Sequence, residues 1–157
     1  MPKPIGQPDS SKPDGSPGLK FDIITPDGVV FSGNVESLVA PGTSGSFGVL
    51  VNHAPFMTTT TIGKIEITRK GNGSASAPKL LKQYFATSGG FIEVLDNQVI
   101  LLAETCEAAE KIDIERAEAS LKRAQERLKS PRQDIDIIRA ELAMKRALNR
   151  IKVAKNK

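Results

Sequence analysis

Four arginines in the last third of the chain stand where their guanidinium groups could share one anion. Apolar and small residues recur at steps of three and four along residues 114–128 and again along residues 137–151, which is the spacing of one helix face. If the two segments are antiparallel helices packed through these faces, equivalent flanks lie on the same side. That flank carries Arg116, Arg123, Arg146 and Arg150. Guanidinium groups suit phosphate oxygens, and several together repel one another unless an anion lies between them.

The residues alone leave three interpretations of this basic flank open. It can be a solvated face that contributes mainly solubility, a surface for a polyphosphate or an acidic protein, or a nucleic-acid surface. Nucleic acid is the weakest of these, because residues 104–157 contain no aromatic side chain to stack on bases. Basic and acidic side chains cancel before residue 104, whereas six basic and no acidic ones follow residue 141. Charge alone does not choose among the three.

Residues that could carry catalysis are few. His53 is the single histidine, and no Gly-x-Ser-x-Gly motif occurs to hold a nucleophilic serine. Gly42, Gly45 and Gly48 form a glycine-rich stretch without a following Gly-Lys-Ser or Gly-Lys-Thr, so we expect turns rather than a P-loop. Cys106 is the single cysteine, which leaves no internal disulfide and no thiolate metal cage. We expect no enzyme active site, no metal site and no required cofactor.

Two kinds of element must position the arginines. Up to residue 103 the chain alternates short β-branched and aromatic runs with turn residues, and residues 64–68 show the alternation of a half-buried strand. Asp96 and Asn97 separate two apolar runs in the manner of a hairpin turn. From residue 104 the composition changes to that of helices. The expected fold class is mainly β plus α, an N-terminal β-sandwich followed by a C-terminal antiparallel two-helix hairpin.

The two helices have recognisable starts and packing faces. Asp113 is placed to cap the first helix, Ser130-Pro131 interrupts the pattern, and Asp134 is placed to cap the second helix. The short link between them predicts an antiparallel pair. The expected buried faces are Ile114, Ala117, Leu121, Ala124 and Leu128 on the first helix, and Ile137, Ala140, Met144, Ala147 and Ile151 on the second.

We expect three segments along the chain. Residues 1–20 are rich in proline, glycine and serine and too poor in apolar residues to order themselves, so we expect a disordered tail. Residues 21–105 form the β-sandwich and residues 106–157 the helical hairpin. We expect no signal or transit peptide, and no apolar run approaches the ~20 residues that span a bilayer.

Several stretches resemble the epsilon subunits of F-type, proton-translocating ATP synthases of the bacterial type. They are Ala40–Gly42, Gly48–Leu50, Asn52–Pro55, Ser88–Val94, Leu102–Thr105, Asp134–Asp136 and Arg139–Ala143, in the order of that family. The resemblance covers about residues 20–155. It implies a non-catalytic subunit of the rotor's central stalk, on the cytoplasmic face of the bacterial inner membrane. It also implies contact with the gamma subunit and the proton-carrying c-ring, with the membrane touched only through the complex.

The resemblance also assigns a role to the helices. Some members bind ATP in the folded hairpin through a pattern Ile/Leu-Asp-x-x-Arg-Ala, which residues 112–117 match in full. It implies a regulatory ATP site at Glu107, Ile112, Asp113, Arg116, Ala117, Arg123, Arg146 and Arg150, with binding but no hydrolysis. The extended hairpin would then restrain ATP hydrolysis, its basic C-terminal helix meeting an acidic surface of the catalytic head. A free-standing ATP-sensing or nucleic-acid-binding module is the alternative function.

Overall fold

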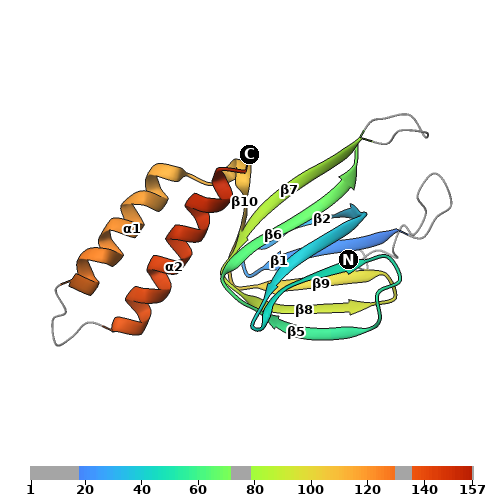
Figure 1. The fold of residues 1–157 in the computed structure, drawn as a ribbon, viewed down its shortest axis with the longest axis horizontal. Helices are drawn as coiled ribbons and strands as arrows, with labels where there is room; N and C mark the ends of the chain where they lie inside the picture. The colour runs from blue at the N-terminus through green and yellow to red at the C-terminus, as the bar shows by residue number, and fades with distance from the viewer. Residues whose placement is uncertain (1–17, 72–78, 130–135, 157) are drawn as a thin grey trace, which may run out of the picture.

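The computed structural model describes residues 18–71, 79–129 and 136–156 of the 157-residue chain. A domain of β-strands comes first and a pair of antiparallel helices follows, as predicted (Figure 1). The strands are β1 Leu19–Thr25, β2 Gly28–Val35, β3 Ser37–Gly42, β4 Gly45–Leu50, β5 Phe56–Thr60, β6 Gly63–Lys70, β7 Leu80–Thr87, β8 Gly90–Leu95, β9 Gln98–Ala103 and β10 Cys106–Ala108. A 3₁₀ turn, η1 Ala109–Lys111, leads into the helices α1 Ile114–Lys129 and α2 Ile137–Ala154.

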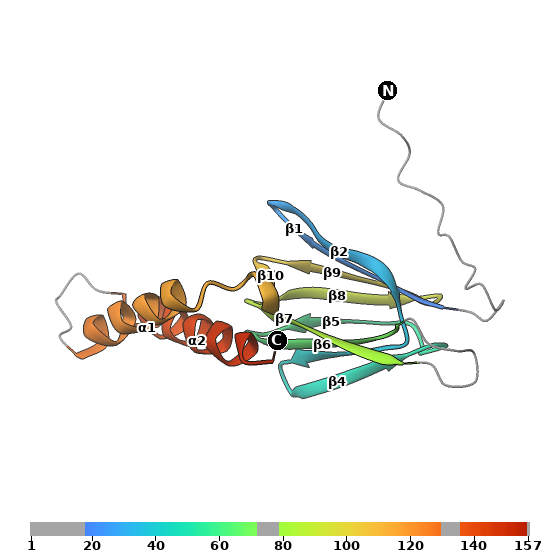
Figure 2. The same ribbon diagram turned by 90° about the horizontal axis from the view of Figure 1, so that it is seen from above.

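The strands form a continuous sheet that folds over itself into a sandwich (Figure 2). Its order is β10-β7-β6-β3-β5-β8-β9-β1-β2, with β4 paired to β3. β1 pairs in parallel with β9, and the other pairings among the described strands are antiparallel. The two ends of this order meet where Phe31 on β2 packs edge-on against Phe85 on β7, with ring centroids 5.6 Å apart. This contact links β2, at one end of the order, with β7, the strand next to the other end.

The core follows the period of two expected of strands with one buried face. Ile65 and Ile67 on β6 are fully buried, which confirms the alternation predicted for residues 64–68. On β1 the residues Leu19, Phe21 and Ile23 are fully buried in the same way. The predicted turn at residues 96–97 is also present, because Asp96 and Asn97 both have positive φ, 48° and 60°, between β8 and β9. Two positive φ values are the geometry of a two-residue hairpin that matches strand twist.

The sheet extends beyond residue 105, where we expected the sandwich to end. Cys106, Glu107 and Ala108 form β10, which pairs antiparallel with the end of β7. The strand carries Glu107 on the sandwich rather than on the hairpin. The local composition hides this strand, because an alanine-rich and acidic stretch reads as the start of a helix.

The caps of the two helices were predicted with unequal success. Asp113 caps α1, since its Oδ1 accepts a 3.0 Å hydrogen bond from the backbone N–H of Arg116. The prediction for α2 was wrong: the cap is Asp136, which accepts from the backbone N–H of Arg139 at 3.0 Å. An N-cap is the residue just before the first helical residue, and α2 begins at Ile137. Asp134 lies outside the described residues.

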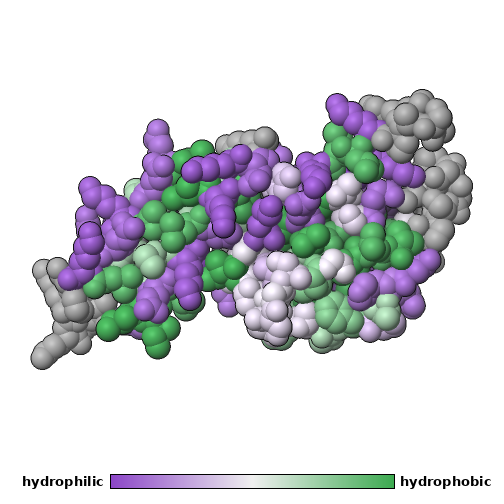
Figure 3. All heavy atoms as spheres, in the orientation of Figure 1, coloured by the Kyte–Doolittle hydropathy of each residue, from purple (hydrophilic) through white to green (hydrophobic). Residues whose placement is uncertain are grey.

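The hairpin packs through its small residues. The buried positions on the facing sides are Ala117, Ala124, Ala140 and Ala147. Ile114 and Ile137 were predicted to be buried and are instead 37% and 52% exposed. Each is the first residue of its helix, at an end of the paired stretch, where the partner helix covers it on one side only. Long hydrophilic side chains project from the hairpin in Figure 3, with apolar and small ones between them.

The hairpin is attached to the sandwich through the end of α2, which lies beside β6 and β7 (Figures 1 and 2). Ala86, Ala109, Ile112, Val153 and Ala154 form a small buried cluster at this junction, separate from the main core. Within the described ranges, no helix is long and apolar enough to cross a membrane.

Candidate functional site

A cavity of about 210 Å³ lies where α1, α2 and β10 meet. Its walls are formed by Glu107, Lys111, Asp113, Arg116, Ala117, Ser120, Ala147 and Arg150. Pockets that enclose drug-sized ligands measure about 300–1,000 Å³. This cavity is therefore large enough for part of such a ligand, such as a chain of phosphate groups.

The two sides of the cavity are joined by an ion pair. Arg150 on α2 donates from Nε to Oε2 of Glu107 on β10 at 3.3 Å. The side chains of Arg150 and Glu107 are 29% and 43% exposed, so both can be reached from solvent. The remaining N–H groups of the Arg150 guanidinium are additional donors for an anion.

Arg116 is held on the opposite wall by the first turn of α1. Its backbone N–H is taken by the Asp113 cap, and its backbone carbonyl accepts from the Ser120 hydroxyl at 2.9 Å. The Arg116 side chain itself is exposed. The positive end of the α1 dipole adds to the charge at this wall, since Asp113 and Arg116 stand at the helix N-terminus.

Five of the eight predicted site residues line the cavity, and three do not. The lining five are Glu107, Asp113, Arg116, Ala117 and Arg150. Ile112 is 3% exposed and belongs to the buried cluster under the hairpin, so it supports the site without facing it.

The four arginines predicted to converge do so only in part. Arg123 turns back along its own helix and donates from Nη2 to the Ser120 hydroxyl at 2.9 Å. It therefore contacts a residue that lines the cavity without lining the cavity itself. Arg146 stands one turn farther from the sandwich than Arg150 and is not among the residues that line the cavity. The spacing of three and four residues placed all four on one flank, but it could not place them relative to the sandwich along the helix axis.

Lys111 and Ser120 line the cavity and were missed from the sequence. Ser120 follows Arg116 by four residues, and that spacing could have found it, because such residues are neighbours on a helix. The sequence held no comparable signal for Lys111, whose position depends on the 3₁₀ turn η1.

The charges around the cavity favour an anion. Lys111, Arg116 and Arg150 provide three cations, against the carboxylates of Glu107 and Asp113. The Asp113 carboxylate is engaged as a helix cap and the Glu107 carboxylate is paired with Arg150. The arrangement suits a phosphate group between Arg116 and Arg150, with the Glu107 carboxylate at its edge to accept hydrogen bonds from a hydroxyl or amino group.

Cys106 and His53, the other residues considered for chemistry, lie in surroundings typical of a structural role. Cys106 is 7% exposed, and burial raises the pKa of its thiol to about 12, so it stays protonated near neutral pH. The ring of His53 lies 5.7 Å from that of Phe56, and its Nδ1 is 2.8 Å from the carbonyl oxygen of Ala54.

Comparison with known proteins identifies the family. A model of the ATP synthase delta/epsilon chain β-sandwich domain matches residues 18–109, and one of the long α-helix domain of the same chain matches residues 110–155. The ATP synthase epsilon chain of Pelotomaculum thermopropionicum is 50% identical over 109 residues, which are 69% of this chain and 75% of that protein. The epsilon chain of Desulforamulus reducens is 43% identical over 111 residues, covering 71% and 77% of the two chains.

A solved structure shares the whole fold. A chain of the Euglena gracilis mitochondrial ATP synthase, solved as an assembly of OSCP, F1 and c-ring, aligns with a TM-score of 0.70 at 22% identity. The alignment covers 98% of this chain and 91% of that one. This likeness extends the sequence match to the arrangement of sandwich and hairpin. Because both family models match the chain and two epsilon chains are 50% and 43% identical to it, the chain belongs to the epsilon-chain family of ATP synthases.

Proposed function

We propose that this chain is a non-catalytic subunit of the central stalk that couples proton-driven rotation to ATP synthesis and restrains ATP hydrolysis through its hairpin. The cavity between Arg116, Arg150 and Glu107 carries the regulatory part of this proposal, because it lies where the hairpin meets the sandwich. ATP bound there would hold α1, α2 and β10 together. In the absence of ATP the hairpin would leave the sandwich and extend.

The sandwich has an exposed apolar surface that supports a protein partner. Phe91 on β8 and Leu102 on β9 are directly paired across the two strands, and they are 59% and 54% exposed. Leu102 is in register with Ile24 on β1, so the surface continues onto the next strand. Exposed apolar patches on small proteins mark interaction surfaces. We assign this surface to the gamma subunit and another part of the same domain to the c-ring, which places the chain at the membrane only through the complex.

The packing of the hairpin fits a two-state element. Its buried residues on the facing sides are Ala117, Ala124, Ala140 and Ala147, and each buried methyl contributes only about 0.8 kcal/mol. A ligand at about 100 times its dissociation constant adds ~2.7 kcal/mol to the state that binds it. ATP can therefore shift the balance between docked and extended hairpins. In the extended state the basic end of α2 would meet an acidic surface of the catalytic head.

Hydrolysis of ATP by a catalytic head depleted of its epsilon subunit tests the stalk assignment. The full chain or a chain that ends at Glu110 is added back. We expect both to bind the gamma subunit and only the full chain to slow hydrolysis. Loss of gamma binding in both would refute the stalk role, whereas binding without any inhibition would leave the stalk role and remove the inhibitory one.

Binding of ATP to the isolated full chain tests the cavity separately. We expect the double variant Arg116→Ala/Arg150→Ala to weaken ATP binding by about tenfold or more, since two charge-assisted contacts to phosphate are lost. Arg127→Ala is the matched control, because Arg127 is exposed in the last turn of α1 and away from the cavity. Equal affinities in all three proteins would exclude the cavity as the ATP site.

A further inference from the structure

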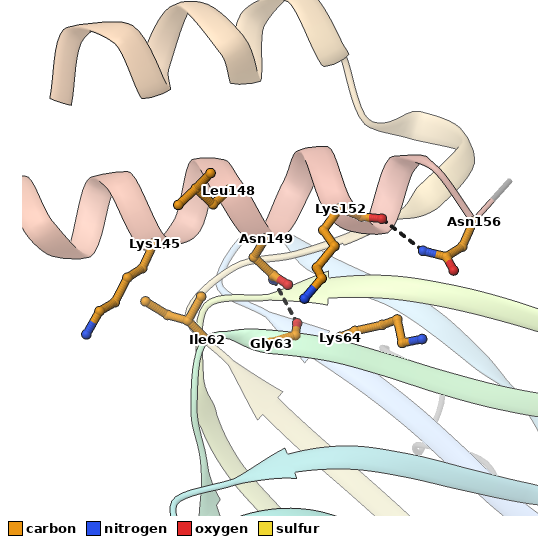
Figure 4. Close-up of a pocket in the computed structure, with 8 residues that line it drawn as sticks. All are labelled: Ile62, Gly63, Lys64, Lys145, Leu148, Asn149, Lys152 and Asn156. Carbon is orange, nitrogen blue, oxygen red and sulfur yellow. Dashed lines mark hydrogen bonds between the residues drawn. The ribbon is translucent and has the colours of Figure 1, made fainter. Parts of the chain in front are cut away.

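A second, larger cavity lies on the opposite face of α2, between this helix and β6 (Figure 4). Its volume is about 580 Å³, and Lys64, Lys145, Asn149 and Lys152 contribute to its walls. Successive helix residues are about 100° apart, so Asn149 and Lys152 point away from Ala147 and Arg150, which face the first cavity. The two cavities are therefore separate sites on either side of one helix.

The walls of this second cavity carry positive charge. Of the eight described residues that line it, three are lysines and none is acidic. Lys145 and Lys152 are seven residues apart on α2, two helical turns and about 10 Å along its axis. Both project from the side of the helix that faces β6, with Asn149 between them (Figure 4).

The third lysine comes from the sandwich. Lys64 follows Gly63 on β6, and Figure 4 shows it lying along this strand below Lys152. Its ammonium is 3.6 Å from a carboxylate oxygen of Glu66. That carboxylate makes its shorter contact with Lys82, at 2.6 Å, so Lys64 is only partly neutralised.

We propose that this cavity binds a small anion with two linked phosphate groups, of which pyrophosphate is the simplest example. Ammonium groups are compact point charges without a fixed fork, so they select a ligand by charge density rather than by planar geometry. Lys145 and Lys152 leave α2 about 10 Å apart, and their flexible side chains can converge so that each ammonium contacts one of two linked phosphate groups. Ile62 and Leu148 add an apolar rim to the same cavity.

Such an anion bridges the two parts of the molecule. Asn149 already links α2 to the sandwich by donating from Nδ2 to the carbonyl oxygen of Gly63 at 2.8 Å. An anion held by Lys64 on one side and by Lys145 and Lys152 on the other adds an ionic link around this hydrogen bond. The anion therefore stabilises the docked hairpin. Any effect of the bound anion on ATP hydrolysis rests on the function proposed above, whereas the binding of the anion does not.

The experiment is a titration of the full chain with sodium pyrophosphate at constant ionic strength, followed by amide NMR shifts. We expect saturable shifts at Gly63, Asn149 and Lys152. The double variant Lys145→Ala/Lys152→Ala should weaken binding by about tenfold or more. The control Lys122→Ala/Lys129→Ala removes the same charge from the exposed face of α1 and should change binding by less than about twofold.

Further arms separate this site from its alternatives. The variant Arg116→Ala/Arg150→Ala should leave the shifts at Gly63 and Asn149 in place, and their loss would assign the anion to the first cavity. Equal weakening in both lysine double variants would show non-specific attraction and overturn the proposal. A hexaglutamate peptide that binds when pyrophosphate does not would also overturn it, in favour of an acidic protein surface. A parallel titration with ADP shows whether the cavity prefers free pyrophosphate or a diphosphate that is part of a nucleotide.

Discussion

Arg150 on α2 and Glu107 on β10 form an ion pair across 3.3 Å, between residues 43 positions apart in the chain. The pair joins the hairpin to the edge of the sandwich at the wall of the candidate nucleotide cavity. It also occupies part of the guanidinium that we assign to phosphate. Glu107 therefore supports the docked hairpin, and under our proposal it would also compete with a phosphate ligand for Arg150.

Replacing Glu107 with glutamine separates these roles. Because both partners are partly exposed, the free energy of unfolding should change by less than about 1 kcal/mol. Binding of tripolyphosphate, measured by calorimetry, should strengthen severalfold, since a competing carboxylate is removed. ATP should gain less if the carboxylate also receives a hydrogen bond from the nucleoside. Glu110→Gln, at an exposed position of η1, is the control, and weaker tripolyphosphate binding would contradict the competition.

Asn149 should control how firmly the hairpin is docked. Its Nδ2 donates to the carbonyl oxygens of Gly63 and Thr87, at 2.8 and 3.3 Å. Asn149→Ala leaves both carbonyls without this donor, which costs about 1–3 kcal/mol. We expect faster amide hydrogen exchange in α2 and unchanged exchange in β8 and β9. In the control Asn156→Ala the lost bonds are to Lys152 and Val153 of the same helix, so docking should be affected less. Unchanged exchange in both variants would show that apolar contacts alone dock the hairpin.

Gly90 is a position where only glycine fits. Its φ is +154°, and a Cβ built there would collide with the carbonyl oxygen of Leu102 on the neighbouring strand. Gly90→Ala should destabilise the sandwich by more than about 4 kcal/mol, measured by urea unfolding, because the backbones of β8 and β9 would have to separate. Gly48→Ala is the matched control, since its Cβ meets nothing closer than 3.9 Å, and should cost about 1 kcal/mol or less. Similar losses for both would contradict the steric argument.

The buried thiol of Cys106 gives a pH dependence with a definite sign. Burial raises the pKa of this thiol to about 12 in the folded chain, whereas the pKa of a thiol in an unfolded chain is about 8.5. Between these two pKa values the thiol keeps its proton in the folded state and loses it in the unfolded state. The contribution of Cys106 to the free energy of unfolding is therefore fully present below about pH 8.5 and falls as the pH rises toward 12. Iodoacetamide at pH 8 should modify the folded protein far more slowly than the protein in urea. Cys106→Ala should reduce the loss of stability between pH 8 and pH 10, and an identical loss in both proteins would contradict this assignment.

The start of α2 can be tested through its cap. Asp136→Ala removes the acceptor for the backbone N–H of Arg139 and should cost about 0.5–2 kcal/mol, seen as faster exchange in the first turn of α2. Asp134→Ala is the comparison, because Asp134 is the cap that the sequence pattern favours. A larger effect at Asp134 than at Asp136 would show that the helix begins earlier in solution.

Much of the local structure was fixed by patterns within a few residues. The alternation around Ile65 and Ile67, the turn at Asp96 and Asn97 and the cap at Asp113 were all predicted, because each depends on backbone preferences and on one buried face. The error at Asp134 has the same origin. The cap is the residue just before the first helical residue, and α2 begins at Ile137, so Asp136 and not Asp134 is the cap.

The candidate site was only partly readable from the sequence. Spacing placed Arg116 and Arg150 on one flank, and the family pattern added Glu107, all of which line the first cavity. Spacing also placed Arg123 and Arg146 on this flank, but neither lines the cavity, since periodicity gives the direction of a side chain around a helix and not its distance from the sandwich.

The sequence by itself determined the order of a β domain and a helical hairpin, the four alanines through which the two helices pack, and the family of this protein. The tertiary structure alone decided that β10 carries Glu107 toward Arg150, that Asn149 bonds to Gly63 86 positions away, and that Lys64 lines the same cavity as Lys152. The physical reason is that hydrophobic patterns act along one element, whereas these contacts depend on how the hairpin docks on the sandwich. That docking is the sum of small contributions from many residues, and no single motif records it.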